Sequence, residues 1–320
     1  MKKILLRALI SLGFIGLLFY GLRDDIPKIV DTLGHMNHPL VAASAGVFLG
    51  SVWLLARRLQ LIFEVKGIPI SLASAVNLTL VGYFFNNFLP TSVGGDLVKA
   101  MCAARLTKNT VLSVTGVLMD RIFGLFIFIL IPSITLLFYM KKIGNPVVPV
   151  VVYSLLFFSG LCFFLIFSRN VARRFGFVVA LLSRFGLEKK ARQIYEGLHD
   201  FKNHKRAVVA AMLLSVTGQS ISIVVLYAMA LALGAHAPLI YFFLLVPVVH
   251  LVSMAPSLGG LGIRENAYVY FLAPFIGRQY AAALGILWLG LLFMLSVFGG
   301  LIYLFLPKYH IRLKEAVNPS

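Results

Sequence analysis

Residues 90–99 read P-T-S-V-G-G-D-L-V-K, and residues 256–264 read P-S-L-G-G-L-G-I-R. Aligned on their glycine pairs, the two stretches keep the same residue types at matching positions, with an offset of 165 residues from Lys99 to Arg264. Proline and paired glycine break helices, and inside a bilayer a broken backbone survives only where protein or a water-filled cavity covers it. Two matching breaks, one in each half of the chain, indicate a binding site at the interface of two repeats.

The composition around these breaks is that of an integral membrane protein. Of the 320 residues, 60% are hydrophobic, and runs of about 20 apolar residues recur along the whole chain. The net charge of +18 lies between the apolar runs, which is typical of cytoplasmic loops and argues against nucleic acid as a partner. Cys102 and Cys162 fall in or beside apolar segments, so no disulfide framework is indicated.

We therefore expect an all-α polytopic membrane protein with about six full spans and two re-entrant, broken helix hairpins. The predicted spans are residues 4–22, 39–62, 110–139, 147–167, 208–233 and 281–306. The predicted hairpins are residues 72–105, which turn at residues 86–95, and residues 239–275, which turn at the second break. The first span resembles a signal peptide but lacks a small-x-small cleavage site, so we expect it to stay attached.

The loop charges predict the orientation. Residues 169–206 carry a net charge of +7, which indicates the cytoplasm, whereas the charged residues of the loop at 23–38 sum to −1, which indicates the outside. The basic residues at 99–108 predict that the first hairpin leaves the membrane on the cytoplasmic side, where it also enters. Three spans then separate the two breaks, and because that number is odd, the two halves form an inverted repeat.

One transmembrane domain, residues 1–320, is expected, with halves at about 1–168 and 207–320 and a basic cytoplasmic loop at 169–206. Both termini are predicted to lie in the cytoplasm of a bacterial or archaeal cell, as parts of a multi-pass inner-membrane protein. Residues 175–185 mix apolar and basic side chains. They are either a helix on the anionic membrane surface or a solvated connector between the halves.

The breaks also predict an anion site. A helix that restarts after Gly94 and Gly95 is expected to point free N–H groups and its positive dipole end at the break, with Lys99 in its first turn. Arg264 occupies the matching place in the second half, so the two cations suit a phosphate group near mid-membrane. Alternatively, both cations only snorkel to the interface. Asp96 would compete with an anion for the same N–H groups.

Asp120 and Arg121 lie inside a predicted span, where ionisable residues are functional or paired. Adjacent residues on a helix point about 100° apart, so we expect their partners on other elements, with Lys99 or Glu265 as candidates. If the span begins only after them, the pair is interfacial and structural. Glu265 either neutralises Arg264, carries a proton or forms a structural ion pair.

The candidate substrate-binding residues are those at and around the two breaks and inside the charged span: Asn86, Asn87, Ser92, Gly94, Gly95, Asp96, Lys99, Asp120, Arg121, Ser257, Gly259, Gly260, Arg264 and Glu265. His250 is expected to be a packing residue, and Ser215, Thr217 and Gln219 are expected to form interhelical hydrogen bonds. No catalytic, metal-binding or cofactor motif is present, so we expect neither an enzyme nor a cofactor.

With these residues in view, the chain resembles the lysylphosphatidylglycerol synthase transmembrane family, also called flippase-like membrane proteins. The resemblance rests on F-x-N-x-L-P-x-x-x-G-G-D-L-V-K at 85–99, D-R-x-x-G at 120–124 and G-G-L-G-I-R-E at 259–265, and it covers nearly the whole chain. It implies a protein that moves lipids or lipid-linked head groups between leaflets.

The family name invites a lysyltransferase activity. We expect none here, because the chain stops at Ser320 and leaves no room for the added soluble transferase domain of some relatives. The expected function is transport of an amphipathic substrate with an anionic head group by alternating access. The expected partners are membrane lipids, either anionic, polyprenyl-linked or glycolipid. The alternative is a membrane-embedded subunit or transferase that works with a separate soluble glycosyltransferase or aminoacyltransferase.

Overall fold

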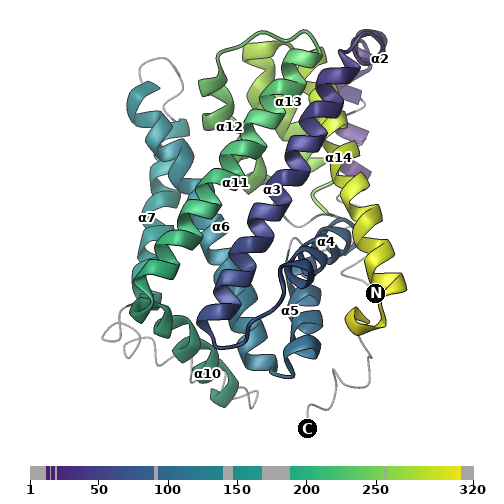
Figure 1. Cartoon of the computed structure of the whole chain (residues 1–320). Helices are drawn as coiled ribbons and strands as arrows, with labels where there is room; N and C mark the ends of the chain where they lie inside the picture. The colour runs from purple at the N-terminus through teal and green to yellow at the C-terminus, as the bar shows by residue number, and fades with distance from the viewer. Residues whose placement is uncertain are drawn as a thin grey trace.

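The computed structural model describes residues 12–310 apart from 15, 19, 90–92, 140–146, 168–187, 256 and 258. Within these residues every regular element is a helix (Figure 1). Four helices are long and apolar enough to cross a membrane, namely α3 (His38–Val65), α6 (Thr110–Tyr139), α11 (Lys205–Ala232) and α14 (Arg278–Phe305). The prediction of an all-helical, multi-pass membrane protein is thereby confirmed.

These four helices correspond to four of the six predicted spans. A fifth predicted span, at residues 147–167, corresponds to α7 (Val147–Phe167), which has 21 residues and no charged side chain. The first predicted span falls partly outside the described residues. The surface-helix prediction at 175–185, and most of the basic loop, also lie outside them.

The first loop contains a helix that was not predicted. Residues of the first loop form α2 (Ile26–Gly34), with Pro27 in its first turn. Its apolar residues Ile26, Ile29, Val30 and Leu33 follow the i, i+3, i+4, i+7 spacing of a helix with one apolar face. Ile29 is buried and Leu33 packs against the core, whereas Ile26 and Val30 are exposed, and the helix contacts α14.

The two breaks each separate a pair of short helices. The first pair is α4 (Leu72–Phe88) and α5 (Gly94–Thr107), and the second is α12 (Leu239–Val252) and α13 (Ile263–Ile276). At 1.5 Å per residue, helices of 14 to 17 residues reach about 21 to 26 Å, less than the roughly 30 Å hydrocarbon core. In Figure 1, α4 and α5 lie toward the end that carries α10 (Glu188–His199), and α12 and α13 lie toward the end that carries α2.

The last helix, α14, packs closely against α4 of the first broken pair. A Cβ atom at Gly299 would overlap the carbonyl oxygen of Leu80, so only glycine lets α14 approach α4 at this point. Near the end of α4, Asn87 donates from Nδ2 to Ser296 Oγ at 2.5 Å and to the carbonyl of Leu292 at 3.2 Å. Helix α14, from the second half of the chain, therefore packs directly against α4 in the first half.

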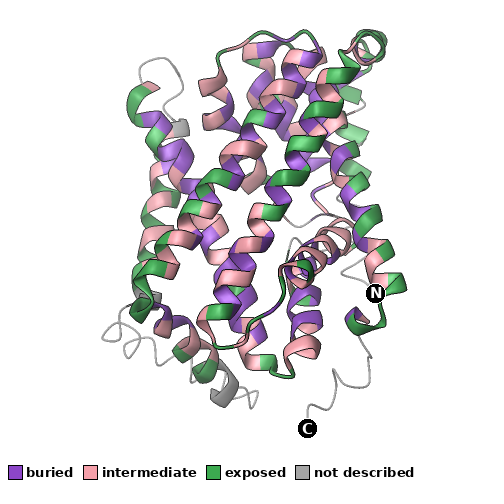
Figure 2. Ribbon diagram, viewed as in Figure 1, coloured by how far each residue is buried: buried purple, intermediate pink, exposed green. Residues whose placement is uncertain are grey.

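Large apolar side chains cover the outer faces of the helices. Trp53, Phe158 and Leu213 are at least half exposed, and exposed residues run along the outward sides of the helices in Figure 2. A surface of this kind suits lipid chains rather than water. The interior, in contrast, holds several charged residues, which the next section describes.

Candidate functional site

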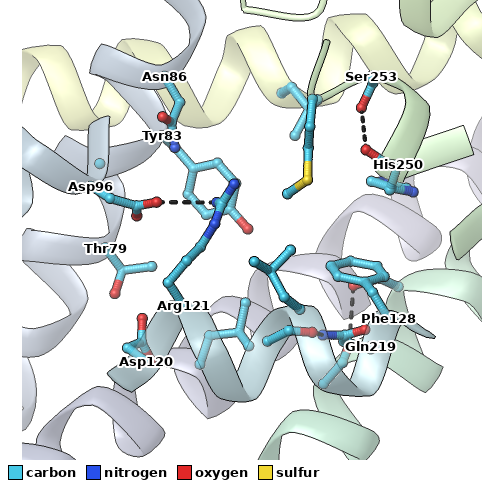
Figure 3. A pocket seen from close by; sticks show the side chains of 18 of the residues that line it. Thr79, Tyr83, Asn86, Asp96, Asp120, Arg121, Phe128, Gln219, His250 and Ser253 are labelled. Atoms are coloured by element: carbon cyan, nitrogen blue, oxygen red, sulfur yellow. Dashed lines mark hydrogen bonds and ion pairs between the residues drawn. The ribbon is translucent and has the colours of Figure 1, made fainter. Parts of the chain in front are cut away.

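A cavity of about 300 Å³ lies between the two broken pairs and helices α3, α6, α11 and α14. Its walls bring together both breaks, because Gly259 of the second break packs directly on the end of α4. A Cβ atom at Gly259 would come within 2.9 Å of the Cα of Asn87 and 3.0 Å of the carbonyl oxygen of Asn86. Figure 3 shows the charged and aromatic side chains that converge on this cavity from different helices.

A three-residue charge cluster forms one wall. Asp120 of α6 accepts a hydrogen bond from Arg58 Nε of α3 at 2.7 Å and from Lys99 Nζ of α5 at 2.8 Å. All three side chains are buried. Arg58 also donates to Ser215 Oγ of α11 at 2.8 Å. The predicted pairing of Asp120 with Lys99 is confirmed, and the cluster ties together four helices.

Arg58 is not among the predicted site residues, because it lies with Arg57 near the end of the predicted span at 39–62. The helix instead continues to Val65, and only Arg57 is partly exposed, where it pairs with Glu64. A signal was present: Ser44, Ser51 and Arg58 recur every seven residues and are all buried on one face.

Arg121 follows Asp120 in sequence but points elsewhere. Its guanidinium lies 3.1 Å from the carboxylate of Asp96, in the first turn of α5 (Figure 3). This pair is less buried than the Asp120 cluster, with side chains 26% and 17% exposed. The predicted divergence of the two neighbouring residues is confirmed, and Glu265 is not the partner of either in the described structure.

Both restarting helices are capped by the chain itself. The Gly95 N–H donates to Asn86 Oδ1 at 2.9 Å, and the Gly262 N–H donates to Glu265 Oε2 at 2.7 Å. One N–H group at each break is therefore already bonded within the chain and is not free for an anion. Short polar or acidic side chains satisfy exposed helix N–H groups and compete with any bound anion.

The second break depends on glycine. Gly259, Gly260 and Gly262 have φ angles of +58°, +80° and +79°, which L side chains rarely adopt. Arg264 folds back over this turn and donates from Nη2 to the carbonyl of Gly259. Its side chain is only 4% exposed, and among the described residues no carboxylate lies within ion-pair distance of it.

The predicted site residues divide into two groups. Those that line the cavity are Asn86, Asn87, Asp96, Lys99, Asp120, Arg121, Gly259 and Arg264. Those that are buried at the breaks without lining the cavity are Gly94, Gly95, Ser257, Gly260 and Glu265. Ser92 lies outside the described residues.

The opposite wall is aromatic and uncharged. His250 stacks on Phe128 with ring centroids 5.3 Å apart and meets Trp288 edge-on at 5.9 Å, while its Nδ1 bonds the Val246 carbonyl at 2.9 Å. Gln219 donates to the Gly124 carbonyl at 2.8 Å. Gln219 thus forms the predicted interhelical hydrogen bond, and His250 packs as expected, yet both also face the cavity.

The cavity carries an excess of positive charge. Four cations line it, Arg58, Lys99, Arg121 and Arg264, against the two carboxylates of Asp96 and Asp120, which leaves a net charge of +2. Buried charge without a counter-ion is unfavourable in a low-dielectric interior, so the arrangement favours an anion. Within the described residues, no group of three His, Cys, Asp or Glu side chains is close enough to hold a metal ion.

The model of a family described as "Lysylphosphatidylglycerol synthase TM region" matches residues 4–300, nearly the whole chain. No curated protein matches the chain.

Proposed function

Because this chain belongs to the lysylphosphatidylglycerol synthase TM region family, we propose that it is a lipid transporter that carries an amphipathic substrate with an anionic, phosphate-bearing head group across the membrane. Membership of the family suggests a membrane protein of lipid modification or transport. The step from this class to transport rests on the cavity.

The observation that carries the proposal is the net charge of +2 in a buried cavity at the meeting point of two broken helix pairs. Broken helices at the middle of a membrane protein mark substrate sites in transporters. A volume of about 300 Å³ corresponds to roughly ten water molecules, enough for a head group but not for two acyl chains. The head group would enter the cavity while the chains remain in the lipid.

The proposed mechanism is alternating access. The two broken pairs act as re-entrant hairpins that enter from opposite faces, in two inverted halves with six full spans and cytoplasmic termini in a bacterial or archaeal inner membrane. The positions of α4–α5 and α12–α13 toward opposite ends of the molecule support this arrangement (Figure 1). The cations of the cavity would offset the loss of hydration of the phosphate.

The second candidate is a membrane-embedded subunit that presents lipid to a separate soluble transferase. The family description favours it, because that description names a synthase. We propose no enzymatic activity for the chain alone: the cavity carboxylates Asp96 and Asp120 are both engaged with cations.

Transport is tested with the purified chain in liposomes that contain a fluorescent phosphatidylglycerol. A membrane-impermeant reductant should bleach only the outer leaflet of empty liposomes and both leaflets when the protein is present. Gly46→Ala, at a glycine with nothing within 4 Å of its Cβ position, should retain transport. Gly259→Val should lose it. If the purified chain gives no more bleaching than empty liposomes, and the inner leaflet is bleached only when a soluble partner enzyme is added, the second candidate is favoured.

A further inference from the structure

The four cations that line the cavity differ in whether a carboxylate pairs with them. Arg58 and Lys99 share the carboxylate of Asp120 at 2.7 and 2.8 Å, and Arg121 pairs with Asp96 at 3.1 Å. Arg264 has no such partner among the described residues. The sequence symmetry of the two breaks is therefore not a symmetry of ion pairing: Lys99 shares a carboxylate with Arg58, and Arg264 has no carboxylate partner among the described residues.

An unpaired guanidinium at 4% exposure is unfavourable unless an anion approaches it. The nearest carboxylate in sequence, Glu265, caps the Gly262 N–H through Oε2 at 2.7 Å. Among the described residues, the Arg264 side chain donates to a neutral partner, the carbonyl of Gly259. Of the net charge of +2 in the cavity, one positive charge lies on the cluster of Arg58, Lys99 and Asp120 and the other on Arg264, and Arg264 is the one of these cations without a carboxylate partner among the described residues.

The backbone at this break is shaped around the guanidinium. A Cβ atom at Gly260 would lie 3.1 Å from Nη2 of Arg264, so glycine leaves room for the side chain to lie against the turn. An arginine held in this way presents a planar fork of N–H donors, which matches two oxygens of a phosphate group. A lysine ammonium offers no such fork.

We propose that Arg264 is the residue that binds the phosphodiester monoanion of the head group, and that Lys99 does not contact it. Asp120 is then a positioning residue, which holds Lys99 and Arg58 in a closed cluster away from the ligand. This inference rests on the proposed function, since it names the contact within the same cavity.

The test compares two variants that remove the same charge by the same change. Arg264→Gln and Lys99→Gln each lower the cavity charge by one, and Lys99→Gln leaves the Arg58–Asp120 pair in place. Binding of phosphatidylglycerol and phosphatidylcholine to the full-length purified chain is measured by native mass spectrometry and by lipid-induced thermal shifts. Wild type should prefer phosphatidylglycerol.

Arg264→Gln should weaken phosphatidylglycerol binding by about tenfold to a hundredfold, as expected for a lost charge-assisted hydrogen bond. Lys99→Gln should weaken it by less than Arg264→Gln does, because Lys99 is paired with Asp120 whereas Arg264 has no carboxylate partner among the described residues. Equal losses in both variants, or a larger loss in Lys99→Gln, would overturn the proposal. If Arg264→Gln does not fold, Arg264→Lys serves instead, and wild-type affinity in that variant would rule out a forked contact.

Two further outcomes separate this inference from the proposed function. A wild-type chain that neither prefers phosphatidylglycerol nor binds glycerol phosphate would overturn both. A preference that survives Arg264→Gln would overturn only the assignment of Arg264. Glycerol phosphate in solution is the second probe: if it binds in an Arg264-dependent manner while phosphatidylglycerol does not, Arg264 remains the anion contact and the lipid substrate is wrong.

Discussion

The ammonium of Lys99 lies 2.8 Å from Oδ2 of Asp120, and both side chains are buried. The contact joins α5 of the first broken pair to α6, and Arg58 extends it to α3 at the other carboxylate oxygen. One carboxylate thus serves two buried cations, which leaves this cluster with a net charge of +1.

Asp120→Asn should strongly destabilise the protein. The change leaves two cations buried without their counter-ion, and breaking a buried pair in this way costs about 3–5 kcal/mol. Thermal unfolding of the purified protein in detergent measures the effect. Lys99→Gln is the control, because Asp120 keeps Arg58 as a partner and the loss should be smaller. An Asp120→Asn protein as stable as wild type would contradict a compensating role.

The effect of replacing a glycine should depend on how closely other atoms pack around its Cα. At Gly95 a Cβ atom would overlap the Gly82 carbonyl and the Asn86 side chain, and at Gly259 it would press on the Asn87 backbone. Alanine at either position should cost about 1–3 kcal/mol through overpacking, and valine at either should abolish transport. Alanine at Gly46 or Gly160, with nothing within 4 Å, should be mild. Valine variants with full transport would show that the breaks are dispensable.

Single-cysteine labelling tests the orientation. In a background without Cys102 and Cys162, a membrane-impermeant thiol reagent applied from outside should modify position 30 in α2. Positions 108 and 190 should react only after the membrane is opened, because the loop charges place them in the cytoplasm. Val30 and Lys108 are both exposed, so access is not blocked by packing. Outside labelling at position 108 would reverse the first broken pair and end the inverted-repeat interpretation.

The contact between Lys66 and Asp200 should make the segment at residues 200–206 sensitive to acid. Lys66 Nζ donates to Asp200 Oδ2 at 3.1 Å, and this hydrogen bond lowers the pKa of Asp200 below its ordinary value of 3.8. Because the folded-state pKa is the lower one, the contact stabilises the segment fully above pH 3.8. The stabilisation is lost as the pH falls below that value through the folded-state pKa.

Hydrogen exchange of residues 200–206, corrected for the intrinsic rate, measures this loss on either side of pH 3.8. Protection should decrease on the acid side in wild type. Asp200→Asn should show the lower protection at every pH and no such change. A pH dependence that persists in Asp200→Asn would assign it to another group.

Much of the helical framework could be predicted because apolar run length and chain breaks are local properties of a sequence. The bounds of α4, α6 and α7 agree with the predicted segments at 72–88, 110–139 and 147–167. The Asp120–Lys99 contact was also predictable, since a buried carboxylate needs a cation and few are available.

What could not be predicted depends on tertiary contacts. Arg58 looks like a loop charge because its carboxylate partner lies 62 residues away, and only a continuous helix through Val65 turns it inward. The caps from Asn86 to Gly95 and from Glu265 to Gly262 likewise depend on how each break folds back. Because of these two caps, side chains rather than the helix ends form the candidate anion site.

The close approach of α14 to α4 at Gly299 and Leu80 has a consequence for biosynthesis. As the chain leaves the ribosome, α4 is inserted long before α14 exists, and its face opposite Gly299 and Ser296 has no permanent neighbour. The amide of Asn87 must meanwhile bond to water, lipid head groups or the insertion machinery, because its final acceptors, Ser296 Oγ and the Leu292 carbonyl, are not yet made. The first half of the molecule therefore completes its structure only when the final helix arrives.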